Sequence, residues 1–161
     1  MLAVRSQPTR AEESVVSQEP MGTAAVITNG RGDYLLHLRD NIPGICDPGA
    51  WSLLGGGRDS DQESPADAIA RELKEEAGLA LPDLRAYAVV PVHGPEGVGR
   101  ITVFAGHWEG DAGKLAVTEG VMVHWFPASM LPRLVMAPWA QAVIEQHEQE
   151  RNGAVADVQP A

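Results

Sequence analysis

The feature that most constrains this chain is a segment near its middle, residues 57–79, where a capped helix is expected to carry closely spaced glutamates. Ser64 is a favourable N-cap, and Pro65 suits the first helical position. Asp67, three residues after the cap, forms a short capping box. Gly78 is the residue type that most readily takes the left-handed conformation after a last turn. We therefore expect a helix that begins at Pro65 and ends just before Gly78.

The charged residues of this helix fall beside its apolar face. At about 100° per residue, the apolar residues that share one face are Ala66, Ile69, Leu73 and Ala77. Glu72, Glu75 and Glu76 fall on the adjoining stripe. Arg71 precedes Glu75 by one turn, where a guanidinium can hold a carboxylate in a fixed rotamer. Carboxylates packed this closely repel one another unless a cation lies between them, so the pattern predicts a metal site.

A short apolar run, residues 51–54, precedes the helix and is followed by Gly55, Gly56 and Gly57. We expect these glycines to let the backbone turn sharply in front of the helix. A glycine loop in that place can offer a carbonyl to a metal and amides to a phosphate. Carboxylate, carbonyl and water oxygens suit Mg²⁺ or Mn²⁺ better than zinc.

The spacing of residues 57–79 resembles a complete Nudix box, the signature of the MutT-like Nudix hydrolases. The matching positions are Gly57, Glu63, Arg71, Glu72, Leu73, Lys74, Glu75, Glu76, Ala77, Gly78 and Leu79. The resemblance implies hydrolysis of a nucleoside diphosphate linked to another moiety, with Mg²⁺ or Mn²⁺ as cofactor. Leu54 is a departure, because many members have proline before the glycines, and it puts the shape of that loop in doubt.

The resemblance also implies roles for residues of the box. Glu75 and Glu76 would be the principal metal ligands, and Glu72 would be a ligand or the general base. The Gly57 region would contribute a carbonyl to the metal, and Arg71 would orient the glutamates. Which carboxylate acts as the base differs among members of the family, so the base stays open.

Other residues extend the expected site. Glu119 resembles the acidic metal ligand that many members carry on a late loop. Arg39 ends a strand and could clamp a phosphate, although arginines at strand ends are usually solvated. Gly56 and Trp51 are expected to bind substrate, Trp51 by stacking on a base, although an aromatic residue in a small core usually packs. Glu63 is either a structural group or one outside the ligand set.

The remaining reactive side chains carry no expected chemistry. Four histidines are interpreted as surface or half-buried residues: His37, His93, His107 and His124. Phe104 is interpreted as a packing residue. Cys46 is the only cysteine, so it has no partner for an internal disulfide, and we interpret it as a packing or loop thiol.

Length and composition predict one domain. The 161 residues are 44% hydrophobic, which is enough for one core and leaves no room for a second domain of ordinary size. We expect the Nudix domain over residues 21–151, a disordered N-terminal tail over 1–20 and a C-terminal tail over 152–161. No secretion signal or membrane span is recognised, so a cytoplasmic protein is expected.

The net charge of −10 argues against a nucleic acid polymer as partner. A small nucleotide substrate is compatible with this charge because bound divalent cations reverse the local field. No membrane partner is expected, and a homodimer stays open.

The pattern between the tails is α/β. The expected strands are residues 23–28, 34–39, 84–92, 100–108 and 121–126, and the last expected helix is 137–150. The residues 29–33 and 94–99 read as turns. Similarity to the Nudix family implies a mixed β-sheet sandwiched between α-helices.

Three functions are compared. The first is a metal-dependent pyrophosphohydrolase acting on a nucleoside triphosphate, an ADP-ribose-like diester or a nucleotide sugar; Pro95, 16 residues after Leu79, is a weak pointer to ADP-ribose. The second is a non-catalytic Nudix-fold module that senses a nucleotide. Such sensors tolerate loss of a carboxylate or the arginine, and none is missing here. The third, isoprenoid diphosphate isomerisation, needs a cysteine near the reacting carbons, and only Cys46 is available.

Overall fold

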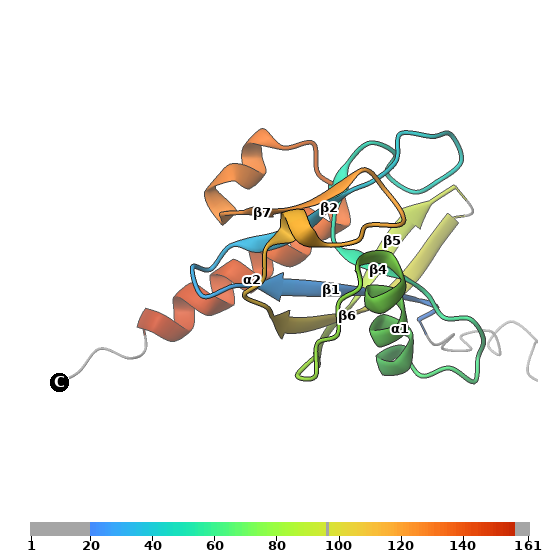
Figure 1. Ribbon diagram of the computed structural model, residues 1–161, viewed down its shortest axis with the longest axis horizontal. Helices are drawn as coiled ribbons and strands as arrows, with labels where there is room; N and C mark the ends of the chain where they lie inside the picture. Colours follow the sequence, from blue (N-terminus) through green and yellow to red (C-terminus); the bar gives the residue numbers. More distant parts are fainter. Residues whose placement is uncertain (1–19, 96, 157–161) are drawn as a thin grey trace, which may run out of the picture.

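The computed structural model describes residues 20–95 and 97–156 and has a mixed α/β architecture (Figure 1). The strands are β1 (Gly22–Thr28), β2 (Tyr34–Leu38), β3 (Trp51–Ser52), β4 (Leu54–Gly57), β5 (Arg85–Gly94), β6 (Gly97–His107) and β7 (Met122–Phe126). The helices are α1 (Pro65–Ala77) and α2 (Pro138–Ala156), with short 3-10 helices η1 (Ala112–Lys114) and η2 (Ala128–Arg133). Within the described ranges, neither helix combines the length and the apolar character that a membrane span requires.

The strands form one sheet in the order β3-β2-β1-β6-β5, with β4 also paired to β1 and β7 also paired to β2. Strands β1 and β6 run parallel, from Gly22 opposite Ile101 to Thr28 opposite His107. The other paired strands of the described sheet are antiparallel, and Gly57 of β4 lies opposite Gly22 of β1. The expected mixed sheet is confirmed.

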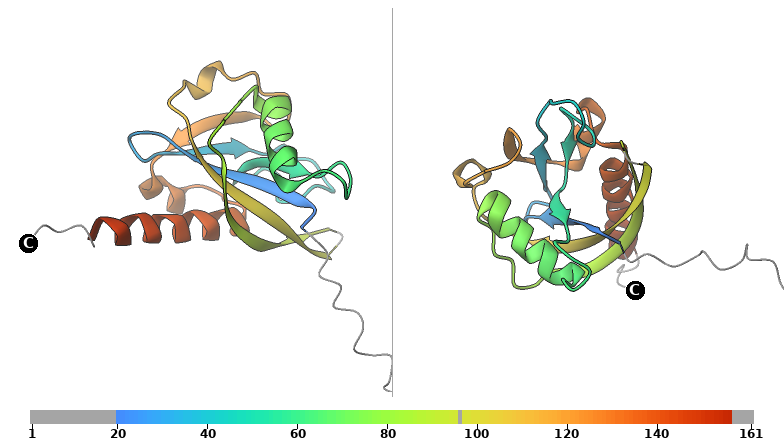
Figure 2. Two further views of the ribbon diagram at one scale, coloured as in Figure 1. Left: turned by 90° about the horizontal axis from the view of Figure 1, so that it is seen from below. Right: turned by 90° about the vertical axis from the view of Figure 1, so that its right-hand side faces the viewer.

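Helices α1 and α2 cover opposite faces of the sheet (Figure 2). Successive residues of a strand point to opposite faces, so Ala24 and Val26 of β1 join the core under α2, while Ala25 and Ile27 join the core under α1. Strand β1 is therefore buried on both faces. This explains why its sequence is an almost continuous apolar run rather than an alternating one.

Helix α1 has the predicted bounds and caps. The Ser64 hydroxyl accepts a hydrogen bond from the Asp67 amide at 3.1 Å. At the other end Gly78 takes φ 65°, and its amide donates to the Lys74 carbonyl at 3.0 Å. Ala66 is exposed, contrary to expectation, because the face that packs on the sheet is rotated toward Ala68.

The glycines before α1 do not form the predicted sharp turn; they make up most of strand β4 and pair with β1. A Cβ on Gly55 would lie 2.1 Å from the Thr23 carbonyl oxygen. A Cβ on Gly56 would lie 2.4 Å from the carboxyl carbon of Glu72. The glycines are therefore needed for the close approach of β1 and α1, and the chain turns later, across residues 58–64.

The β5–β6 hairpin is tighter than predicted. Strand β5 ends at Gly94 and β6 begins at Gly97, so the strands pair through most of the residues 94–99 that were expected to form the turn. Glycines have no side chains to pack, so the glycines of this segment give no strand pattern in the sequence. The segment therefore reads as a longer turn.

Helix α2 is longer than predicted and continues to Ala156, so residues 152–156 of the expected C-terminal tail are helical. Contacts that sequence does not reveal hold this end: Tyr87 donates to Glu150 at 2.9 Å, and Arg151 donates to the Gly32 carbonyl at 3.0 Å. Apart from Pro20, the expected N-terminal tail lies outside the described residues.

Gly55→Ala should destabilise the protein by about 1–3 kcal/mol, the usual cost of overpacking, because its Cβ would meet backbone atoms of β1. Gly153→Ala in α2 is the matched control, since nothing lies within 4 Å of its Cβ position. Helix propensity predicts a neutral or stabilising effect at Gly153. Chemical denaturation of both variants checks this, and equal midpoints would contradict the close-approach explanation.

Candidate active site

Arg71 connects the charged edge of α1 to the end of β4. Its Nη1 donates to Glu72 Oε1 at 2.9 Å and to Glu75 Oε2 at 3.1 Å. Its Nη2 donates to the carbonyl oxygen of Gly57 at 2.9 Å. One guanidinium thus fixes two carboxylates and a backbone carbonyl relative to each other.

Glu63, whose role the sequence leaves open, belongs to the same network. It accepts two hydrogen bonds from Arg71, to Oε1 at 2.7 Å and to Oε2 at 3.0 Å. The amide of Asp59 also donates to Glu63 Oε2 at 2.7 Å. The bonds from Arg71, and then the one from Asp59, lower the pKa of Glu63 to about 2. Glu63 therefore stays ionised and fastens the turn between β4 and α1 to the helix.

Glu76 points toward the interior instead. Its residue is 6% exposed, and its Oε2 has no hydrogen-bond partner among the described residues. Burial is the largest cause that raises the pKa of Glu76 to about 8, followed by interaction with the carboxyls of Glu119 and Glu72. A hydrogen bond from the Gly55 amide acts in the opposite direction. Positive charge brought to such a carboxyl would stabilise its ionised form.

Glu76 lines a cavity of about 120 Å³ between α1, the end of β2 and the loop before β7. Its polar lining residues are His37, Arg39, Asp40, Glu76 and Glu119. The fold therefore places Arg39 and Glu119, two residues predicted from outside the box, beside Glu76. Arg39 Nε donates to the carbonyl of Cys46 at 2.7 Å, which ties the strand end to the following loop.

His37 is a site residue that sequence analysis missed. It is 5% exposed, and its Nε2 lies 2.7 Å from the carbonyl oxygen of Glu119. Burial is the main cause that lowers the pKa of His37, so the ring is neutral at neutral pH. The signal available in the sequence was a single polar residue inside the apolar run of β2.

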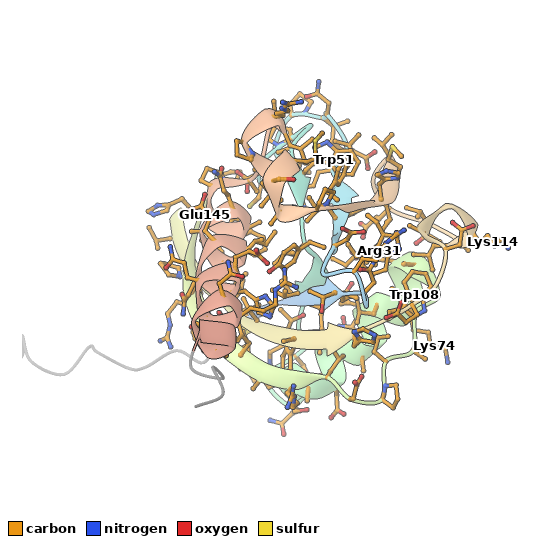
Figure 3. The ribbon with its side chains drawn as sticks, turned by 90° about the vertical axis from the view of Figure 1, so that its left-hand side faces the viewer. Arg31, Trp51, Lys74, Trp108, Lys114 and Glu145 are labelled. Atoms are coloured by element: carbon orange, nitrogen blue, oxygen red, sulfur yellow. The ribbon has the colours of Figure 1, made fainter. Side chains whose placement is uncertain are left out.

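The other two residues predicted to bind substrate, Trp51 and Gly56, do not line this cavity. The Trp51 ring packs edge-on against Phe126, with centroids 4.8 Å apart. Trp51 lines neither this cavity nor the larger one described below, so its stacking on a base is not supported by its position. Gly56 lies directly against the Glu72 carboxyl. Lys74 is exposed on the outer side of α1 (Figure 3).

The candidate metal donors lie on two sides of helix α1. Within residues 20–95 and 97–156, no three acidic, histidine or cysteine side chains are already grouped as a metal site. Arg71 draws Glu72 and Glu75 to one side of α1, while Glu76 lies with Glu119 on the other. The candidate donors are all oxygens, and Oε2 of buried Glu76 lacks a partner. These properties fit Mg²⁺ or Mn²⁺.

A second cavity, about 490 Å³ and mainly apolar, lies at the ends of β1, β5 and β6. Residues that line it include Met21, Gly22, Cys46, Val92, Val98 and Ile101. Ile42 and Ile45 line the acidic cavity, whereas Gly44 and Cys46 line the apolar one. The loop after β2 is therefore a wall that the two cavities share.

Glu76 should make the stability of the metal-free protein depend on pH. Its pKa is about 8 in the folded protein and near the ordinary 4.5 when unfolded, so the folded state binds more protons between these values. The free energy of unfolding should therefore fall as the pH rises from about 4.5 to about 8. Thermal unfolding in chelator measures this, and Glu76→Gln should flatten the decline. Parallel pH profiles for both proteins would show that Glu76 is not its source.

Comparison with known proteins identifies the family of this chain. A family model, the NUDIX domain, matches residues 19–147. No curated protein sequence matches the chain. The MutT protein from Methanosarcina mazei Go1 superposes with a TM-score of 0.69 at 24% identity, over 82% of this chain and 94% of that one.

Two further solved structures are similar. The MutT NUDIX hydrolase from Burkholderia pseudomallei gives a TM-score of 0.67 at 26% identity, over 80% of this chain and 98% of that one. The NUDIX domain of NrtR from Shewanella oneidensis, complexed with ADP ribose, gives 0.68 at 20% identity, over 83% and 88%. The family model spans most of the chain and includes the whole segment of residues 57–79, and so this chain belongs to the Nudix family.

Proposed function

We propose that this protein is a metal-dependent pyrophosphohydrolase that cleaves a nucleoside diphosphate linked to another moiety. The observation that carries the proposal is the buried carboxyl of Glu76. It has an unpartnered oxygen and a raised pKa, and the carboxyls of Glu72 and Glu119 contribute to that shift. Ionising a buried carboxyl without a compensating charge costs free energy, and a bound cation would supply that charge.

The metal ligands in this proposal are Glu72, Glu75, Glu76, Glu119 and the carbonyl of Gly57. A bound Mg²⁺ or Mn²⁺ ion would neutralise charge on the pyrophosphate and make a water more acidic. Forming this ligand set requires Glu72 and Glu75 to turn from Arg71 toward Glu76, a change of side-chain rotamers on one helix.

The protein's own groups then have separate tasks. Before metal binds, Arg71 holds Glu72 and Glu75, and Glu63 keeps Arg71 itself in place through two hydrogen bonds. Glu72 or Glu75 accepts the proton of the attacking water. Arg39, on the wall of the same cavity, contacts a phosphate oxygen. Gly56, which lies against the Glu72 carboxyl, leaves the room that a phosphate beside Glu72 would need.

The apolar cavity supplies a place for the organic part of the substrate. Its volume of about 490 Å³ is within the range of small-molecule sites, roughly 300–1,000 Å³. The loop after β2 lines both the apolar and the acidic cavity, so the two cavities are neighbours. A substrate that crosses this loop can place its phosphates by Glu76 and its organic moiety beside Met21 and Ile101. This arrangement suits a nucleoside diphosphate derivative better than free pyrophosphate.

The alternative function is a sensor that binds a nucleotide without hydrolysing it. The similar NUDIX domain of NrtR was crystallised with ADP ribose, so a bound nucleotide derivative alone does not distinguish the two functions. The complete set of box glutamates and Arg71 favours the hydrolase.

A panel of nucleoside triphosphates, ADP-ribose-like diesters and nucleotide sugars tests the proposal. We expect release of phosphate-containing products from at least one class when Mg²⁺ or Mn²⁺ is present and none in excess chelator, because the carboxylates alone cannot neutralise the pyrophosphate. Binding of a nucleotide without turnover in either metal would favour the sensor. Equal rates with and without chelator would rule out the metal-dependent reaction.

Glu119→Gln should raise the metal concentration needed for half-maximal rate by on the order of 10-fold or more, the scale seen when a group near a metal is lost. Glu109→Gln is the control: Glu109 is also exposed, but it lies against Gly30 in the turn between β1 and β2, and its carboxylate is 2.6 Å from His107 Nε2. It should leave the metal titration unchanged. If the two variants titrate alike, Glu119 is not a ligand.

A further inference from the structure

We infer that His37 is a positioning residue that holds Glu119 beside Glu76, an inference that rests on the proposed function. The segment of residues 118–121 before β7 is fastened to two separate elements, strand β2 and the end of α1. His37 is the one side chain of β2 that bonds to Glu119 itself. In the sheet, His37 follows buried Leu36 and lies opposite Ser52 of β3 and Val123 of β7.

The contact between His37 and the loop is close and specific. Nε2 lies 2.7 Å from the Glu119 carbonyl oxygen, and since a carbonyl can only accept, this nitrogen carries the proton. Gly120 follows with φ 76°, and a Cβ there would lie 2.1 Å from Nε2 of His37 and 2.7 Å from the Leu38 carbonyl. The backbone of the loop therefore lies directly on the imidazole, which only glycine permits.

Further bonds complete the attachment to β2. The Gly120 amide donates to Asp40 Oδ2 at 3.1 Å, and the Val121 amide donates to the Leu38 carbonyl at 2.8 Å. These bonds fix the loop after Glu119, whereas the bond from His37 fixes Glu119 itself. Removal of the imidazole would leave Glu119 held only through its neighbours in the chain.

Thr118 attaches the loop to helix α1. Its amide donates to the Glu76 carbonyl at 3.0 Å, and its hydroxyl donates to the Glu75 carbonyl at 2.9 Å. These carbonyls belong to the last turn of the helix, where no intrahelical amide is available to them. Glu119 is thus placed between a bond to the proposed ligand helix and a bond to His37.

The energetics favour a role for the imidazole beyond filling space. Burying a polar ring costs free energy unless it is hydrogen-bonded, and the neighbours Leu35 and Leu36 show that an apolar residue is compatible with this strand. Within the described residues, the hydrogen-bond partner of the His37 ring is the Glu119 carbonyl. The hydrogen bond to the loop therefore accounts for a histidine at this position.

Mn²⁺ binding to the full chain, without substrate, is the direct measurement, and the signal of free Mn²⁺ in electron paramagnetic resonance reports it. His37→Leu removes the donor and should weaken Mn²⁺ binding about 10-fold. His37→Gln places an amide donor near the position of Nε2 and should recover most of that loss. His124→Leu, at an exposed histidine on neighbouring strand β7, should bind Mn²⁺ like the wild type.

A double-mutant cycle separates positioning from a general structural effect. If His37 acts through Glu119, then His37→Leu causes no further loss of Mn²⁺ affinity in a Glu119→Gln background. Additive losses would overturn the inference, and so would wild-type affinity in His37→Leu. Should His37→Leu fail to fold in a thermal scan, His37→Asn decides the same cycle, because its amide is too short to reach the loop but keeps the site polar.

The proposed function fails in a different way. No Mn²⁺ binding by the wild-type protein would overturn the metal site, and the inference with it. Wild-type binding and turnover combined with an unchanged His37→Leu would overturn the inference alone.

Discussion

Repulsion among neighbouring carboxylates is the constraint on which the rest of this site depends. Arg71 offsets this repulsion on one side of α1, where its guanidinium forms ion pairs with Glu63, Glu72 and Glu75. No such cation reaches Glu76, which is buried and keeps an unpartnered oxygen within the described part of the chain. The helix therefore has a neutralised edge and an unneutralised edge, and the second one faces the cavity shared with Glu119.

Glycines in β4 let helix α1 and strand β1 pack closely against that strand. Gly55 and Gly56 allow β4 to lie close to β1 and to the Glu72 carboxyl. Strand β1 is buried on both faces, so a shift of β4 would disturb the cores under both helices. The helix backbone that carries the carboxylates is consequently anchored to the centre of the sheet.

The remaining parts of the site come from elements distant in sequence. Arg39 follows β2, Glu119 precedes β7, and the pairing of these two strands brings them to one end of the sheet. The loop after β2 then divides the acidic cavity from the apolar one. A substrate with a charged end and an apolar end matches this division, and that match links the fold to the proposed chemistry.

The sequence by itself determined the helix of the box, because Ser64, Pro65 and Gly78 act locally and need no partner. It also determined the family, since the order of glutamates and Arg71 is a local pattern on one helix. Only the tertiary structure decided that Gly55 belongs to a strand and that His37 contacts Glu119. Hydrogen bonds and close contacts between residues far apart in sequence leave no periodic pattern in the sequence. Which residues make them depends on how the strands pair.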